Sequence, residues 1–86
     1  MYEIVNQPID MIAIFGKEFN DIKPFKFKWN NKDFIVTKIG YKHKVREGRK
    51  IVHVFSVTDG TNFFELRFDA NDVAWQLGRT WDGEAN

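Results

Sequence analysis

A strict alternation of aromatic and lysine residues, ending in a two-residue turn, constrains the fold of this chain more than any other feature. The stretch Phe25-Lys26-Phe27-Lys28-Trp29 puts three rings on one side of a strand and two lysines on the other. Asn30-Asn31 suits a type I′ turn, because asparagine tolerates positive φ. The turn then matches aromatic with apolar residues and lysine with aspartate. The expected pairs are Trp29–Lys32, Lys28–Asp33, Phe27–Phe34 and Phe25–Val36.

Later turns extend this hairpin into a meander. Strands are expected over residues 32–45 and 50–58, and Gly40 predicts a bulge or bend within the first of them. Turns centred on Glu47-Gly48 and Asp59-Gly60, and a four-residue connection after Phe68, set the register. The expected pairs are Gly40–Phe55, Phe55–Phe64, His53–Leu66, Ile51–Phe68, Phe68–Val73, Leu66–Trp75 and Phe64–Leu77.

These registers agree on one continuous apolar face. A meander with such a face must cover it, either by closing on the N-terminal strand or by pairing with another copy. We expect an all-β fold, an antiparallel meander of five to six strands in a strongly curled sheet or small barrel. The run Ile9–Phe15 is apolar on both sides and predicts a largely buried strand. The expected core is Phe25, Phe27, Trp29, Phe34, Val36, Ile51, Phe55, Val57, Phe64, Leu66, Phe68, Val73, Trp75 and Leu77.

Length and composition favour a single cytoplasmic domain over residues 1–86, with residues 1–7 and 82–86 as candidates for frayed ends. The chain is 43% hydrophobic, which argues against disorder, and no run is long enough to span a membrane. With no cysteine, and with His43 and His53 expected on opposite faces, neither a metal site nor a cofactor is predicted.

Acid–base chemistry has few candidates in this sequence. Glu65 lies in mid-strand near Arg67, and His53 alternates with the apolar residues Ile51 and Phe55. Both patterns are typical of ordinary strand residues, and phosphate loops, metal motifs and nucleophile elbows are absent. We therefore expect a binding protein, and an enzyme with Glu65 or His53 in a cleft is the least favoured alternative.

The distribution of charge indicates a binding surface more clearly than the net charge of +1. Residues 22–50 hold ten of the 13 basic side chains and two acids. A basic hairpin beside an aromatic ring suits single-stranded nucleic acid. Two structural explanations are the alternatives: acidic residues on adjacent strands neutralise these cations, or the lysines keep an exposed edge strand soluble. The candidate nucleic-acid-binding residues are Lys38, Tyr41, Lys42, Lys44, Arg46, Arg49 and Lys50, with His43 among them and Lys26 and Lys28 as a possible extension.

An apolar strip on the second sheet face favours a different function. If exposed, it would suit a homodimer or a protein partner, and otherwise residues 1–15 or the loop 17–21 would cover it. The candidate interface residues are Ile39, Tyr41, Val52, Val54 and Phe63.

The segment Phe27–Phe34, followed by a strand, a basic hairpin and Phe64-Glu65-Leu66, resembles a family of small prokaryotic all-β domains of unknown function. The pattern in that family is roughly aromatic-basic-Trp-x-Gly-x-x-aromatic, with a Tyr-Glu-Leu-like strand and a Trp strand in the C-terminal half. Here Asn31 stands at the expected glycine and Phe64 at the common tyrosine. The resemblance spans Pro8–Trp81 and implies a stand-alone β-domain, with no activity, cofactor or catalytic residue to transfer.

Overall fold

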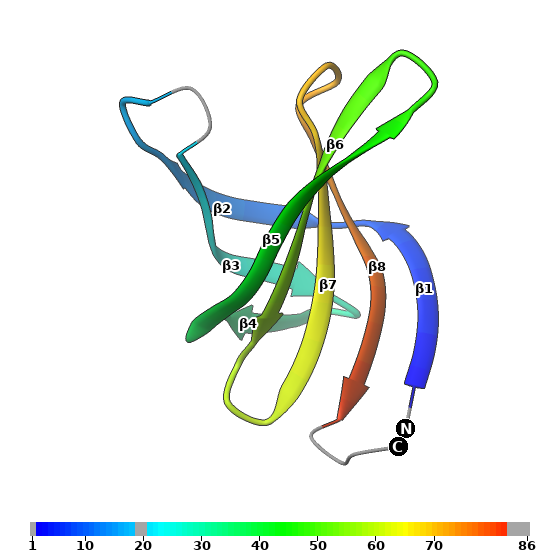
Figure 1. Ribbon diagram of the computed structural model, residues 1–86. Helices are drawn as coiled ribbons and strands as arrows, with labels where there is room; N and C mark the ends of the chain where they lie inside the picture. The colour runs from blue at the N-terminus through cyan, green and yellow to red at the C-terminus, as the bar shows by residue number, and fades with distance from the viewer. Residues whose placement is uncertain (1, 19–20, 83–86) are drawn as a thin grey trace.

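The computed structural model of this protein describes residues 2–18 and 21–82. It is all-β, as predicted, and its eight strands form two antiparallel sheets that face each other (Figure 1). One sheet has five strands in the order β1-β8-β7-β6-β5, and the other has three in the order β2-β3-β4. The strands are β1 (Tyr2–Pro8), β2 (Asp10–Phe15), β3 (Ile22–Trp29), β4 (Lys32–Ile35), β5 (Lys38–Glu47), β6 (Lys50–Thr58), β7 (Asn62–Asp69) and β8 (Ala74–Asp82).

The predicted aromatic–lysine hairpin is confirmed as β3 and β4. Trp29 pairs with Lys32, Lys28 with Asp33 and Phe27 with Phe34, and the Val36 amide donates to the Phe25 carbonyl over 2.8 Å. Asn30 and Asn31 have φ values of 55° and 61°, as a type I′ turn requires. The nearest lysine to Asp33 is Lys26, at 3.8 Å, so the ion pair is diagonal.

The long strand predicted over residues 32–45 is instead two strands in different sheets. β4 ends at Ile35 and β5 begins at Lys38, and between them the Thr37 amide donates to the Thr58 carbonyl over 2.9 Å. The chain therefore folds over at this point and places the apolar face of β3 and β4 against that of β6, β7 and β8. Of the two predicted forms, a strongly curled sheet or a small barrel, the closed barrel is not found, because no strand pairing in residues 2–18 and 21–82 joins one sheet to the other.

Three of the predicted registers differ from the observed ones by two residues. The loops are Gly48-Arg49, residues 59–62 and residues 70–73, so Phe55 faces Lys42 and Leu66, while Phe68 faces His53 and Trp75. A shift of two keeps the side chains of β6 and β7 on their predicted faces, because the side-chain period of a strand is two. Gly40 does form a bulge, but it lies between the pairs of Ile39 and Tyr41 and no ring faces it.

The N-terminal residues add strands to both sheets. β1 pairs with β8 as an edge strand, so residues 2–7 are ordered, while Met1 and residues 83–86 lie outside the described residues. The prediction that the run 9–15 is largely buried is wrong: Ile12 is 59% exposed and Ile14 55%. β2 pairs with β3 at the edge of the smaller sheet, and only one of its faces contacts the core.

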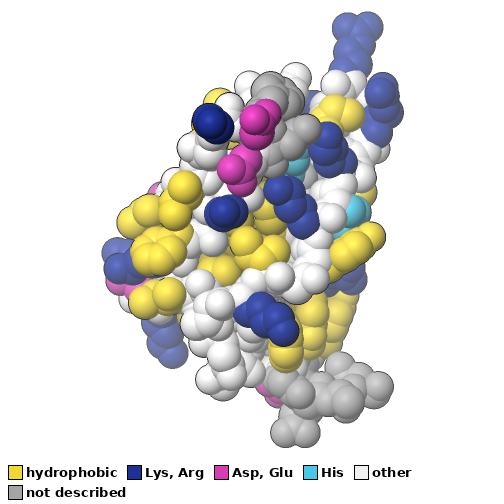
Figure 2. Space-filling view, turned by 60° about the vertical axis from the view of Figure 1, so that its left-hand side comes forward, with side chains coloured by type: hydrophobic (Ala, Val, Ile, Leu, Met, Phe, Trp, Pro, Cys, Tyr) yellow, Lys and Arg dark blue, Asp and Glu magenta, His cyan; other side chains and the backbone are white. Residues whose placement is uncertain are grey.

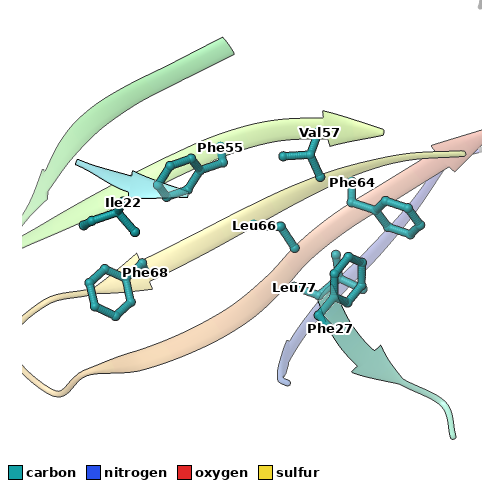
Figure 3. Close-up of a cluster of buried hydrophobic side chains, with 8 residues drawn as sticks. All are labelled: Ile22, Phe27, Phe55, Val57, Phe64, Leu66, Phe68 and Leu77. Carbon is teal, nitrogen blue, oxygen red and sulfur yellow. The ribbon is translucent and has the colours of Figure 1, made fainter. Parts of the chain in front are cut away.

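The core lies between the sheets, with Ile22 and Phe27 from β3 packed on side chains of β6, β7 and β8 (Figure 3). The Phe27 and Phe64 rings meet edge to face with their centres 5.0 Å apart. Most of the predicted core is buried or packed against it. Phe25 is the main exception, at 48% exposed. It is the extra residue of a bulge, because Lys26 pairs with Ile12 and Pro24 pairs with Ala13, the next residue of β2. Val73 is also wrongly predicted, since it lies in a turn and is 72% exposed.

Candidate nucleic-acid interface

The predicted basic hairpin is formed by β5 and β6, and it projects beyond the body of the larger sheet (Figure 1). β5 is an edge strand that pairs with β6 on one side only, among the described residues. Its lysines and its arginine are all exposed. An edge strand of this composition resists pairing with other chains, and it also offers cations to an anionic ligand.

The cations of β5 divide between its two faces. Three cations share the face that continues the core, because their partners in β6 lie on that face. The pairs are Lys42 with Phe55, Lys44 with His53 and Arg46 with Ile51. The Lys42 ammonium nitrogen is 5.7 Å from the centre of the Phe55 ring. Alternate residues of a strand are about 6.8 Å apart. The three side chains therefore form a regular row of positive charge along the open side of the sheet, which we call the cationic row.

Tyr41 and His43 lie on the opposite face of β5. They pair with Ser56 and Val54, and their rings are 5.0 Å apart. The structure therefore separates Tyr41, the predicted stacking ring, from the cationic row. Arg49 lies in the exposed turn, and Lys38 pairs with Thr58 at the other end of the strand.

Two hollows of about 280–290 Å³ lie at the edge of the smaller sheet, one beside the start of β5 and the other beside His53 of β6. Lys23 and Phe25 line the first together with Lys38 and Ile39 of β5. Phe15 and Lys17 line the second, together with His53, which faces Lys44. Figure 2 shows hydrophobic side chains in a central hollow with lysine and arginine side chains around it. Lys42, Lys44 and Arg46 line neither hollow, but the first hollow contains the start of β5 and the second contains His53, the partner of Lys44. Each hollow contains an exposed phenylalanine, Phe25 at 48% and Phe15 at 51%.

His53 is the buried polar residue of this region, at 4% exposed. Its ring centre is 6.1 Å from that of Phe68, and its Nδ1 atom has no hydrogen-bond partner among the described residues. Burial, together with the positive charges of Lys44 and Lys42, lowers the pKa of His53 below its ordinary value. The imidazole is therefore neutral at pH 7, and it lies beneath the cationic row without a paired carboxylate.

Lys50, another of the predicted cations, is neutralised by acidic residues. Its ammonium nitrogen lies 2.8 Å from Asp72 Oδ2 and 3.1 Å from Asp69 Oδ2. Hydrogen bonds to these carboxylates raise the pKa of Lys50. Glu47 forms an ion pair with Arg67 on the outer face. Neutralisation across strands thus accounts for part of the basic block, and Glu18 and Asp21 line the second hollow beside Lys17.

The predicted apolar strip does not form a continuous exposed surface. Val52 and Val54 are 5% and 2% exposed, and their cross-strand neighbours on the outer face include Val45, His43 and Arg67. Neither β1 nor β2 lies over them: β1 extends the same sheet, and β2 belongs to the other. The other strip residues are partly exposed, but Ile39 pairs with Val57 on the inner face while Tyr41 and Phe63 lie on the outer face.

An exposed apolar surface that sequence reasoning missed lies on the outer face of the smaller sheet. Ile12 and Ile35 flank Lys26 in one row across the strands, and Ile35 is 52% exposed. Ile14 and Phe25 extend this surface along β2 and β3. The bulge at Phe25 reverses the alternation of β3, so the pattern of residues placed this ring on the wrong face.

Within the described ranges, no helix could cross a membrane, and no three histidine or acidic side chains gather as metal ligands would. No protein-family model, curated protein or solved structure matches this chain. The resemblance to small prokaryotic all-β domains therefore stays a prediction, and a function must be argued from the surface itself.

Proposed function

We propose that this protein binds single-stranded nucleic acid along β5. The observation that carries the proposal is the cationic row of Lys42, Lys44 and Arg46 on one face of β5. Two hollows that contain exposed aromatic rings lie near this strand, one at its start and one beside His53, the partner of Lys44. Neutralised phosphates release their condensed counterions, and this release supplies most of the affinity of non-specific nucleic-acid complexes. A flexible single strand can follow such a row while its bases turn toward the rings.

Phe15 and Phe25 are the rings in position to stack on bases. Each is about half exposed, and each lines a hollow next to the β5–β6 hairpin. Stacking on an aromatic side chain contributes about 1–3 kcal/mol for each base and tolerates any sequence. The arrangement favours binding with little sequence preference, in which cations set the path and rings hold the bases.

Fluorescence anisotropy of labelled single-stranded DNA and RNA oligomers tests the proposal. For three phosphate contacts, the affinity is expected to fall by about 20-fold between about 50 and about 200 mM salt. The double variant Lys42→Glu/Lys44→Glu should lose most binding at low salt. Replacing the same residues by glutamine should leave weaker binding, with a fall of about threefold over that salt range.

Lys28→Glu/Lys32→Glu is the matched control, because it changes the net charge equally at the other end of the smaller sheet. Lys28 and Lys32 line hollows that contain no residue of β5. Its binding should stay close to that of the wild type. An equal loss in both double variants would mean that only net charge matters, and an absence of binding at low salt would refute the proposal.

A second candidate function is self-association through the outer face of the smaller sheet. The observation that favours it is the exposure of Ile12, Ile14, Phe25 and Ile35 on one face, since apolar residues grouped in this way often mark an interface. The mass in solution, measured by light scattering over a range of concentrations, tests it. A dimer that Ile12→Ser/Ile35→Ser converts to a monomer would support this function, and a wild-type monomer at all concentrations would exclude it.

A further inference from the structure

A further hollow lies at the opposite end of the sheets from the β5–β6 turn. Its volume is about 590 Å³, within the range of small-molecule sites. One wall is the tip of the β3–β4 hairpin, with Trp29, Asn30 and Lys32. The other wall comes from the larger sheet and includes Glu3, Asn62, Thr80, Trp81 and Asp82. The buried ring of Phe64 lies between the two sheets and forms part of the lining.

The Trp29 ring is held in place at the mouth of this hollow. Its indole nitrogen donates a hydrogen bond to Gln7 Oε1 over 3.2 Å, and its ring centre is 6.3 Å from that of Phe34. The ring is partly exposed, so it offers surface to a ligand. A fixed aromatic ring binds the apolar face of a flat or ring-shaped ligand with little loss of side-chain entropy.

The polar groups of the hollow both donate and accept hydrogen bonds. Glu3 provides acceptor oxygens, Lys32 provides donors, and the amide of Asn62 provides both. The charges of Glu3 and Lys32 balance, so these groups present no excess of positive charge to attract a phosphate group. A neutral ligand with many hydroxyl groups fits this mixture better than an anion does, because each hydroxyl both donates and accepts.

We infer that this hollow binds a neutral sugar, with one face of the sugar ring on Trp29 and its hydroxyls on Glu3, Lys32 and Asn62. The site is independent of the cationic row, since none of its lining residues belongs to β5. Two hairpins and the paired ends of β1 and β8 hold its walls in place, so the site exists before the ligand arrives.

NMR titration of the wild-type protein with neutral disaccharides tests this inference. Maltose, cellobiose, lactose, diacetylchitobiose and xylobiose, at millimolar concentrations, differ in linkage and in the orientation of their hydroxyls. At least one should cause saturable shifts of the Glu3, Asn30, Asn62 and Thr80 amides and of the Trp29 indole proton. Trp29→Leu should weaken that binding by about tenfold, because it removes the stacked ring.

Ile4→Ala is the matched control. Ile4 is next to Glu3 in β1, is 67% exposed and does not line the hollow, so its loss should leave sugar binding unchanged. Glu3→Gln, which alters a polar contact and spares the core, should also weaken binding if Trp29→Leu does not fold. Either an absence of localised shifts with all five sugars, or shifts at this hollow only with an oligonucleotide, would overturn the inference.

Discussion

The ammonium group of Lys50 donates a hydrogen bond to the carboxylate of Asp72 over 2.8 Å. This contact joins the tip of the β5–β6 hairpin to the β7–β8 turn. Asp69 also takes part, and although burial opposes its ionisation, hydrogen bonds from Lys50 and from the Asp72 and Asn71 amides lower the pKa of Asp69. Lys50 is thus positioned by two acids, whereas the cationic row faces the open side of the sheet.

This difference between lysines leads to a first prediction. Lys44→Gln should weaken oligonucleotide binding more than Lys50→Gln, because the charge of Lys50 is already neutralised by Asp69 and Asp72. Anisotropy titrations of both variants at low salt provide the comparison. Equal losses would show that every cation of the hairpin contributes alike, which would contradict the proposed path along one face of β5.

The β3–β4 turn allows a second prediction, about stability. Asn31 has a φ of 61°, and glycine adopts this conformation without steric cost. Asn31→Gly should therefore stabilise the protein by about 0.5–1 kcal/mol, since Asn-Gly is the preferred sequence for a type I′ turn. Asn31→Val should destabilise it, because a β-branched residue is strained at positive φ. Urea unfolding measures both effects, and a destabilised glycine variant would argue against this turn.

A third prediction compares two phenylalanines that are two residues apart. Phe27 is 2% exposed and Phe25 is 48% exposed, because the bulge in β3 separates their faces. Phe27→Ala should cost about 3–5 kcal/mol of unfolding free energy. Phe25→Ala should cost about 1 kcal/mol or less, as expected for a surface position. If Phe27→Ala does not fold, Phe27→Leu should show a smaller cost in the same direction, and similar costs at both positions would contradict the bulge.

The buried imidazole of His53 leads to a fourth prediction, about pH. Burial, Lys44 and Lys42 lower its pKa in the folded state, so the fold favours the neutral ring. The unfolded chain binds a proton at this residue near its ordinary pKa of about 6.5. Below that pH the unfolding free energy should therefore fall, by up to about 1.4 kcal/mol per pH unit, until the pH passes below the folded-state pKa.

Urea unfolding at about pH 8 and at about pH 5.5 measures this loss of stability, because the two pH values lie on either side of the ordinary histidine pKa. His53→Leu should lose less stability between the two conditions than the wild type does, because it has no ring to protonate. His43 is present in both proteins and so serves as an internal control. The same loss in both proteins would assign the acid sensitivity to other groups.

Residues adjacent in sequence determined most of the local structure. The alternation from Phe25 to Trp29 and the Asn30-Asn31 turn specified the first hairpin and its register, because pairing across a two-residue loop leaves no freedom. The other turns were located to within one residue: the loops at 48–49 and 70–73 have the predicted lengths but lie one residue later than predicted, and the loop after Thr58 is longer than predicted. A glycine and its polar neighbours fit several such loops. Because each register error was an even number of residues, the core face was still predicted correctly at residues such as Leu66 and Leu77.

The candidate binding surface was predicted less completely. The sequence identified Lys42, Lys44 and Arg46, but it grouped them with Tyr41, which lies on the other face, and with Lys50, which is neutralised. Phe15 and Phe25 were missed because both were predicted to be buried, Phe15 within an apolar run and Phe25 from the alternation. Cations follow the local pattern of one strand, whereas a ring beside them comes from a strand distant in sequence.

The sequence by itself determined an all-β chain, the face of each later strand and the position of its turns, because these depend on the two-residue period and on backbone preferences at a few residues. Only the tertiary structure decided that the chain folds over between Ile35 and Lys38 and that the bulge at Phe25 exposes its ring. It also decided that β2 has one open face. The physical reason is that two sheets can share one core only when strands far apart in sequence meet, and no local pattern encodes that packing.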